Sequence, residues 1–549
     1  MTHIKKINTS LLAILILAAF LRFYNLNSSP PSLYSDEISL GYNAYSLLKT
    51  GKDEFGNFLP LSLRSFGDYK PALSAYAMIP SIAVFGLNEF AVRFPFAFFG
   101  TLTVLLIYLI TKELFSDRKL ALLASLLLSI SPWHIQQSRS AMLVGLEIFF
   151  ISLGTLLFLR GLNKKPFFLL FVLPFSLAFY TYYGSRVTIP LLVLLLIFTH
   201  FKKLVTQKKL VLKTFLFGLL LLTPLIYTTF QNPKTISGRT GTISVFYQPG
   251  VKLKLWEDSR MDGNQNPLLT RTFHNKVFYY FLDITERYFQ HFNPRFLFFE
   301  GSKVSPFEIP NMGIFYLIDG LFLVLGFFCL VSKSKKESWF LVGWLLISPV
   351  VASLTFMTPA SNRSFNMVIP AQIIIALGII SFLRKIKSSS KKKLTVSIIV
   401  IIYFISFLFF QYNFHVQIPQ LSPHQWFYGK KQMIKELEKI EKGYQKIVFI
   451  KGGPYYIYLL FYKKVDPTLF AQNFRRSPYV DELGWENVES FQKYEFLFDG
   501  SWDKVKKEKN VLYISLASDF PSEMPFIKEI LFPNGQAAYR LAEGAKLYE

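Results

Sequence analysis

Two adjacent acidic residues open the first polar segment of the chain. Asp36 and Glu37 follow the proline-containing stretch 30–35, just beyond an apolar run. Neighbouring carboxylates repel each other and any anionic lipid near them, so their presence at a membrane surface indicates a use. One such use is to deprotonate a hydroxyl group. The structural alternative is that Ser35 or Asp36 caps a helix over 38–48.

Four basic residues are candidates for binding an anion. Lys70 directly precedes Pro71, and a lysine before a proline-started helix would place its ammonium beside free backbone N–H groups, as a phosphate site requires. The alternative is a lysine that only reaches along the membrane surface. Arginines occupy three further short connections, and three that converged above a helix bundle would suit an anionic ligand. They are Arg139, Arg186 and Arg363.

Aromatic residues surround one of these arginines. Tyr180, Tyr182 and Tyr183 precede Arg186 and would suit either a sugar ring or an aromatic belt at the membrane surface.

The single cysteine, Cys329, lies in an apolar run and excludes both a disulfide framework and a cysteine-based zinc site. The histidines have no metal-site spacing, and no glycine-rich phosphate loop is present. We expect no cofactor, and the sequence leaves assistance by a divalent metal open.

The elements that must position these residues are membrane helices. Of the 549 residues, 52% are hydrophobic and 17% are charged, whereas soluble proteins carry about 25% charged residues. The apolar residues form runs separated by basic islands, which excludes a disordered chain. The net charge of +25 does not indicate nucleic-acid binding, because nucleic-acid binders rarely contain this much apolar sequence. The composition predicts a polytopic α-helical membrane protein.

Eleven apolar runs are candidates to cross a bilayer, which needs roughly 20 residues as a helix. No cleavage site follows the first run, so we interpret it as a retained helix and not as a signal peptide. The runs are 10–24, 93–111, 119–132, 141–159, 166–183, 187–200, 212–229, 311–331, 338–357, 365–383 and 394–412.

The distribution of basic residues predicts which side of the membrane each connection faces. Connections rich in basic residues usually lie on the cytoplasmic side of the membrane. In this chain the basic connections all fall on one side if the apolar stretch 71–87 does not cross the membrane. This stretch has prolines near both ends, so we predict a helix lying in the outer interface. The N-terminus is then cytoplasmic in an integral plasma-membrane protein. The basic connections are 111–119, 160–165, 200–213, 332–337 and 384–393, and the predicted outer segments are loops 25–92 and 230–310 and turns 131–140 and 358–364.

The segment after residue 412 has no further span. Its apolar runs 446–450 and 511–516 are short and alternate with charged stretches, and 432–442 has the pattern of an amphipathic helix. We predict two domains, a membrane domain over 1–412 and a small extracytoplasmic α/β domain over 413–549.

With these residues placed, the chain resembles the GT-C fold glycosyltransferases of family 39 and the RgtA/B/C/D-like group. These are related to protein O-mannosyltransferases and to the aminoarabinose transferase of lipid A. The resemblance covers roughly residues 8–412. It rests on five motifs in order, Asp36-Glu37, Asp68–Leu73, Asn88–Pro95, Ser138-Arg139-x-Ala141 and Tyr180–Arg186.

The chain departs from the family pattern at two points. Ala72 replaces the second proline after the lysine. Met142 and Val144 stand where the family often has a basic residue and an acid, so a second catalytic acid is missing there. Glu147, one turn further on, could replace this acid or could be a buried residue of a helix face.

The resemblance implies transfer of a sugar, with inversion, from a polyprenyl-phosphate donor to an acceptor on the outer face. The acceptor could be a lipid, a protein or a glycan, and the other partners would be membrane lipids. Asp36 would bind or deprotonate the acceptor hydroxyl, and Glu37 would orient it or cap the following helix. The expected donor-phosphate residues are Lys70, Arg139, Arg186 and, more weakly, Arg363; Tyr180, Tyr182, Tyr183 and Asp68 would shape the sugar and acceptor pocket.

Two other functional classes remain open from the sequence. A lipid-linked sugar transporter or flippase would also be polytopic, but it should contain half-helix repeats and polar residues at mid-membrane. A non-catalytic partner in glycan assembly would keep the fold and lose Asp36. The presence of Asp36 together with Lys70 favours an enzyme.

Overall fold

The chain forms two compact units. The helical unit comprises residues 1–24, 97–138 and 143–413, and the sheet unit comprises 25–96, 139–142 and 414–549. The segment 25–96, which includes the predicted outer loop 25–92, therefore groups with the C-terminal residues. The computed structural model describes residues 9–233, 235, 241, 243–261, 267–302, 304, 306–333, 335–451, 453–480, 486–497, 502, 508–521 and 524–544.

A helix or helix pair lies at each of the eleven places where a span was predicted. Within the described part of the chain, six helices are long and apolar enough to cross a membrane, namely α4, α7, α10, α11, α19 and α20. The chain is thus built as a multi-pass membrane protein, and the number of eleven crossings stays a prediction. The bounds are α1 (Thr9–Phe23), α4 (Glu89–Phe115), α5 (Arg118–Ile130), α7 (Leu143–Gly161), α8 (Lys165–Leu170) with α9 (Val172–Phe179), α10 (Ser185–Val205), α11 (Lys208–Gln231), α16 (Leu317–Lys333), α17 (Lys336–Ile347) with α18 (Val350–Ser353), α19 (Val368–Lys385) and α20 (Ser389–Tyr412).

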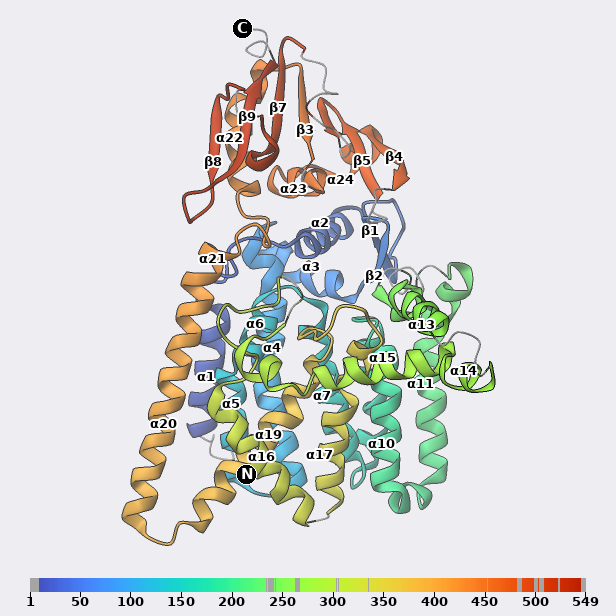
Figure 1. Ribbon diagram of the computed structural model, residues 1–549, viewed down its shortest axis with the longest axis vertical. Coiled ribbons are helices and arrows are strands. Elements are labelled where there is room, and N and C mark those ends of the chain that lie inside the picture. Colours follow the sequence, from blue (N-terminus) through green and yellow to red (C-terminus); the bar gives the residue numbers. More distant parts are fainter. Residues whose placement is uncertain are drawn as a thin grey trace, which may run out of the picture. The chain divides into compact units, whose positions relative to one another are not determined.

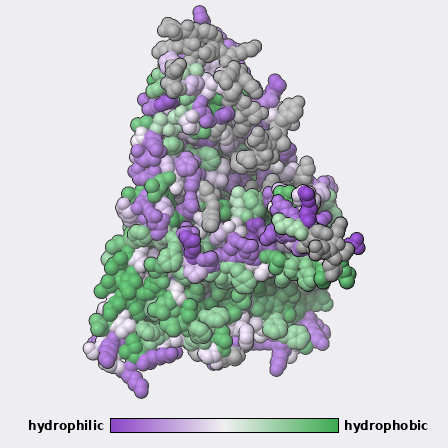
Figure 2. All heavy atoms as spheres, viewed as in Figure 1, coloured by the Kyte–Doolittle hydropathy of each residue, from purple (hydrophilic) through white to green (hydrophobic). Residues whose placement is uncertain are grey.

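Apolar side chains form a broad band over the helical unit on the face that Figure 2 shows. On α20, for example, Leu394, Ile401 and Ile405 are more than half exposed. Such a surface is costly in water and favourable in lipid. Inside the unit, α16 and α19 lie side by side (Figure 1). A Cβ added to Gly326 would come within 1.9 Å of the Ile374 carbonyl oxygen, so glycine permits this close approach of two backbones.

Proline explains why two predicted spans are interrupted. Pro349 separates α17 from α18, and Pro174 lies in the first turn of α9, just after the break that divides it from α8. A proline lacks the backbone N–H that would continue the helical hydrogen bonds from the preceding turn.

Two predicted connections are helical, which corrects the sequence analysis. The supposed turn 131–140 contains α6 (Pro132–Arg139), which begins with a proline at its first position. The supposed loop 230–310 contains α13 (Gly250–Met261), α14 (Pro267–Phe273) and α15 (Lys276–Gln290). The Asn275 side chain caps α15 by accepting a hydrogen bond from the Phe278 N–H at 3.0 Å.

The sheet unit contains a seven-stranded mixed sheet, ordered β4-β5-β6-β3-β7-β9-β8. The central strand β3 pairs in parallel with β6 and β7, and the other pairs are antiparallel. Strands β3 and β7 coincide with the two apolar runs singled out in the sequence. The strands are β3 (Lys446–Ile450), β4 (Phe474–Val480), β5 (Glu486–Phe491), β6 (Tyr494–Leu497), β7 (Val511–Leu516), β8 (Lys528–Leu531) and β9 (Ala537–Glu543).

The segment 25–96 packs against this sheet through short helices. It contains α2 (Ser35–Thr50), the hairpin of β1 (Ser62–Ser65) and β2 (Asp68–Pro71), and α3 (Leu73–Phe85). Helices α23 (Tyr455–Tyr462) and α24 (Pro467–Asn473) lie between the sheet and α2, and α22 covers Lys430–Ile440 (Figure 1). With 13 residues, α3 is about 20 Å long, short of the roughly 30 Å that a span requires.

Candidate active site

The start of α2 separates the roles of the two adjacent acids. Tyr34 occupies the N-cap position, so the expectation that Ser35 or Asp36 caps this helix is wrong. Instead, the Glu37 carboxylate reaches back and accepts a hydrogen bond from the Tyr34 N–H at 2.9 Å. An acid at the third helical position satisfies a backbone donor in this way. Asp36 is therefore not used to begin the helix.

Glu37 forms a buried ion pair with Arg93 of α4. Both side chains are fully buried, and the carboxylate accepts hydrogen bonds from Arg93 Nε at 3.0 Å and from Nη2 at 3.1 Å. Glu37 Oε1 also accepts from the Ala141 N–H at 2.7 Å. Four donors thus converge on one carboxylate, and this geometry fits a positioning role.

The same arginine fixes the loop that leads into Asp36. Arg93 Nη1 donates to the Pro30 carbonyl oxygen at 2.8 Å, and Nη2 donates to the Ser32 carbonyl oxygen at 2.5 Å. A second buried arginine, Arg139, donates through Nη2 to the Ser29 carbonyl oxygen at 2.9 Å. Burial, with the neighbouring Arg93 charge, lowers the pKa of Arg139 to about 9. Arg139 was expected at the donor phosphate, and its observed contacts position the loop.

Asp36 pairs with Lys70 at the edge of this arrangement. The Lys70 Nζ lies 2.6 Å from Asp36 Oδ1, and the Asp36 side chain remains 35% exposed. Lys70 Nζ also donates to Ser65 Oγ at 3.4 Å and lies 5.3 Å from the centre of the Phe66 ring. The hairpin thus holds an ammonium against the more accessible of the two acids.

The position of Lys70 corrects one expectation. It lies on strand β2, opposite Leu63 of β1, and α3 starts only at Leu73, so Lys70 does not directly precede the helix. Asp68, predicted for the sugar and acceptor pocket, is in the same hairpin, and its Oδ1 accepts from the Tyr69 N–H at 2.8 Å.

Among the predicted site residues of the helical unit, Arg186 stands out because two of its buried side-chain nitrogens have no hydrogen-bond partner within the described residues. Its guanidinium lies 4.6 Å from the centre of the Tyr183 ring. Within the described part of the chain, its Nε and Nη1 are buried and have no hydrogen-bond partner. Ser185, the preceding residue, donates to Glu147 Oε1 at 2.7 Å and ties the start of α10 to α7. Buried donors without acceptors are costly, so this site is suited to an added acceptor group.

The remaining predicted residues of the helical unit have structural contacts. The Tyr180 hydroxyl donates to the Leu221 carbonyl oxygen at 2.8 Å, and the Tyr182 ring packs against Gly184. The Tyr183 hydroxyl donates to the Thr235 carbonyl oxygen at 2.9 Å. Arg363 is buried and donates through Nη1 to Thr355 Oγ1 at 2.7 Å and to the Met357 carbonyl oxygen at 3.2 Å.

The structure brings Asp36, Glu37, Lys70 and Arg139 together in the sheet unit. Arg186, Arg363 and the three tyrosines belong to the helical unit, and convergence of the three arginines stays a prediction. The role of Arg93 was not predicted, although this residue lies in the motif Asn88–Pro95. An arginine in an apolar helix needs a partner, and that signal could have linked it to the acidic pair.

Among the described residues, no group of three or more His, Cys, Asp or Glu side chains could hold a metal ion.

Comparison with protein families confirms the resemblance to this group of glycosyltransferases. Residues 69–227 match the model of the dolichyl-phosphate-mannose-protein mannosyltransferase family. An uncharacterized protein of Aquifex aeolicus is 31% identical over 163 residues, which are 29% of this chain and 31% of that protein. The putative mannosyltransferase YkcB of Bacillus subtilis is 28% identical over 163 residues, or 29% and 22% of the two chains. The matched region is thus less than a third of the length of these curated relatives.

Solved structures share the fold over a larger part of the chain. ArnT of Cupriavidus metallidurans bound to undecaprenyl phosphate matches with a TM-score of 0.57 and 12% identity, covering 97% of this chain and 98% of ArnT. The oligosaccharyltransferase AglB of Archaeoglobus fulgidus, in complex with an inhibitory peptide and a dolichol-phosphate, matches with a TM-score of 0.51 and 13% identity. That match covers 82% of this chain and 63% of AglB. These likenesses show a GT-C membrane fold.

Proposed function

We propose that this protein is a membrane glycosyltransferase that moves a sugar from a polyprenyl-phosphate donor to a hydroxyl group of an acceptor on the outer face of the plasma membrane. The family match and the GT-C fold support this class of reaction. Among the similar structures, ArnT binds undecaprenyl phosphate and AglB binds a dolichol-phosphate. The observation that carries the proposal is the partly exposed Asp36 carboxylate, held 2.6 Å from the Lys70 ammonium.

Asp36 is the proposed base of an inverting transfer. The acceptor oxygen forms a bond to the anomeric carbon while the bond from that carbon to the donor phosphate oxygen breaks. The hydroxyl proton passes to the Asp36 carboxylate, and the lipid phosphate leaves with one more negative charge than it had in the donor. Glu37 does not compete for this role, because its oxygens already accept hydrogen bonds from Arg93 and from two backbone N–H groups.

Lys70 is the proposed cation for the departing phosphate. An ammonium placed where negative charge develops lowers the barrier to reaction. In the absence of the donor, Lys70 neutralises Asp36. When Lys70 turns toward the phosphate, Asp36 loses part of that neutralisation and becomes a stronger base. A single lysine thus couples arrival of the donor to activation of the acceptor.

Arg186 is proposed independently as a phosphate ligand. Two of its buried nitrogens lack hydrogen-bond acceptors among the described residues, and the Tyr183 ring holds the guanidinium plane. Arginine donates two parallel hydrogen bonds to phosphate oxygens, so a phosphate would satisfy these donors.

The proposal is tested by mass spectrometry of surface glycans and membrane lipids from cells with and without this protein. Loss of one sugar from one acceptor is the expected result, and the sugar should return with the wild-type protein. It should not return with Asp36→Asn produced at the same level in the membrane. Unchanged glycans and lipids in cells lacking the protein would contradict the proposed function.

A further inference from the structure

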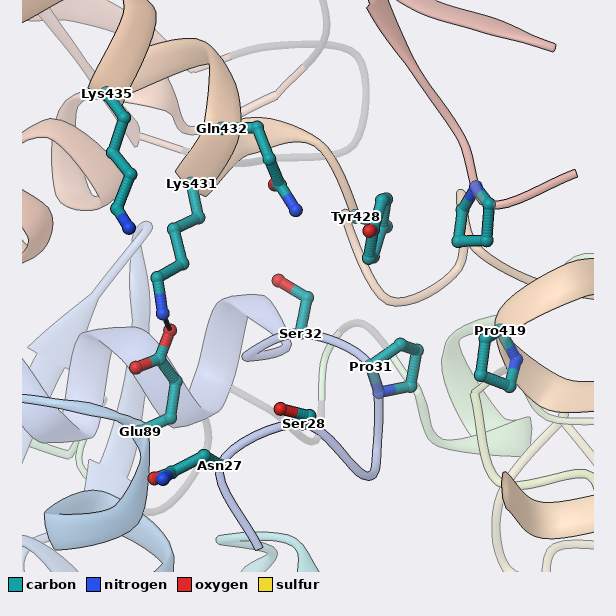
Figure 3. A pocket seen from close by; sticks show the side chains of 11 residues that line it. Asn27, Ser28, Pro31, Ser32, Glu89, Pro419, Tyr428, Lys431, Gln432 and Lys435 are labelled. Carbon is teal, nitrogen blue, oxygen red and sulfur yellow. Dashed lines mark hydrogen bonds and ion pairs between the residues drawn. The ribbon is translucent and has the colours of Figure 1, made fainter. Parts of the chain in front are cut away.

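A polar cavity of about 350 Å³ lies in the sheet unit and is lined in part by the loop that leads into Asp36. One wall is α22, which contributes Lys431, Gln432 and Lys435 (Figure 3). The facing wall is the loop itself, which contributes Ser28 and Ser32, and the Ser32 hydroxyl is directed toward α22 (Figure 3). The cavity has the size of a small-molecule site and is assembled from segments far apart in the sequence.

The cavity carries an excess of one positive charge. Lys431 Nζ is neutralised by Glu89 Oε1 at 2.5 Å, drawn as a dashed line in Figure 3. Lys435 is exposed and forms no ion pair or hydrogen bond with any residue that the structure describes. The Lys435 ammonium is therefore available to an anion, whereas the Lys431 ammonium is paired with the Glu89 carboxylate.

The other lining groups fit a molecule rich in hydroxyl groups. Serine hydroxyls and the Gln432 amide can both donate and accept hydrogen bonds, as sugar hydroxyls do. Tyr428 and three prolines add flat apolar surfaces on which the C–H face of a sugar ring can pack. One anionic group surrounded by several hydroxyls matches this combination of side chains.

The cavity shares its loop with the candidate active site. Ser32 lines the cavity with its side chain, while its carbonyl oxygen accepts the hydrogen bond from Arg93 Nη2. Asp36 follows only four residues later. A ligand in the cavity would therefore contact the same loop that Arg93 fixes.

We propose that this cavity binds an anionic sugar headgroup, of which a sugar phosphate is the simplest example. Lys435 pairs with the anion, and the serines and Gln432 bind the hydroxyl groups. The headgroup can belong to a soluble glycan or to a lipid, since both present the same chemistry.

The test measures binding to the purified full-length protein with no donor present. Glucose 1-phosphate is titrated in the first arm, with methyl glucoside as the uncharged control. In the second arm the protein is placed in nanodiscs containing phosphatidylinositol or only phosphatidylcholine. The variants are Lys435→Gln, Glu89→Gln and the matched control Lys439→Gln, which changes a lysine one turn further along α22 that pairs with Glu436.

The proposal predicts that the anionic sugar binds in at least one arm and that methyl glucoside does not. Lys435→Gln should weaken binding roughly fivefold, the effect of losing about 1 kcal/mol of charge attraction. Glu89→Gln should strengthen binding by a similar factor because it releases Lys431, and Lys439→Gln should leave binding unchanged.

Absence of binding in both arms, or equal binding by wild type and Lys435→Gln, would overturn the proposal. Lys435 is exposed, so its substitution does not endanger folding. Asp36→Asn should bind the anionic sugar like the wild type. Binding in the cavity is thus measured independently of transfer by Asp36. The proposed binding site can fail while the proposed transferase function holds, and the reverse is also possible.

Discussion

Glu37→Gln should destabilise the sheet unit far more than its small change in size implies. The carboxylate accepts hydrogen bonds from Arg93 Nε and Nη2, from the Ala141 N–H and from the Tyr34 N–H. Glutamine keeps one accepting oxygen and replaces the other with an NH₂ group, which must then face two donors. The substitution also leaves the fully buried Arg93 guanidinium without an opposite charge.

Breaking a buried ion pair on one side costs about 3–5 kcal/mol. For a compact unit of about 200 residues, each kcal/mol corresponds to roughly 2–4 °C in the unfolding midpoint. The expected fall is therefore about 6–20 °C, measured by thermal unfolding of the detergent-solubilised protein at one scan rate. The matched control is Glu489→Gln, which removes the partner of Arg475 in a more exposed pair and should cost about 0–1 kcal/mol.

A double-mutant cycle identifies the cause of the loss. Arg93→Met alone leaves Glu37 as an unpaired buried charge, whereas the double variant leaves neither charge. The double variant should therefore lose less stability than the sum of the two single variants, by at least about 1 kcal/mol. A midpoint for Glu37→Gln within about 1 °C of the wild type, or strictly additive losses, would refute the positioning role of Glu37.

Three further predictions concern other buried groups. Burial among three aromatic rings, whose centres lie 4.4–4.6 Å from Nζ, lowers the pKa of Lys430 to about 7 from 10.5. Below pH 7, the buried Lys430 ammonium lowers the free energy of unfolding. This loss disappears as the pH rises from 7 toward 10.5, because the folded protein releases the proton before the unfolded chain does. Lys430→Met should raise the unfolding midpoint most at pH 6, and an equal gain at pH 10 would contradict this. Arg186→Gln should raise the KM for the lipid donor about tenfold with little change in kcat, and an unchanged KM would argue against phosphate binding. Glu147→Gln should keep kcat within about twofold because a glutamine oxygen still accepts from Ser185, whereas a loss beyond about 100-fold would give Glu147 a chemical role.

Local sequence signals predicted the elements that depend on local properties. Strands β3 and β7 coincide with 446–450 and 511–516 because each is a short apolar run bounded by polar residues. A helix lies at each predicted span because long apolar runs need internal hydrogen bonding in lipid. The helices α13–α15 were missed because they are short, with 12, 7 and 15 residues, and contain charged residues, so none of them holds a long apolar run.

The pairing of the site residues could not be predicted because it depends on distant contacts. Asp36 and Glu37 are neighbours in the sequence, yet one is partly exposed and the other is fully buried. This difference arises from Arg93, 56 residues beyond Glu37. Likewise, only the hairpin of β1 and β2 brings Lys70 to Asp36. The two acids can be found in the sequence, but their different partners, Lys70 for Asp36 and Arg93 for Glu37, become visible only in the folded chain.

The role of Asp36 as the base is tested by measuring transfer from a polyprenyl-phosphate sugar to the acceptor with purified Asp36→Asn protein. We expect a loss of about 10²–10⁴-fold in kcat with little change in the unfolding midpoint, since Asp36 is partly exposed. Asp466→Asn is the matched control, because asparagine can still cap α24 from this exposed position. It should retain wild-type activity. Full transfer activity of folded Asp36→Asn protein would show that Asp36 is not the base.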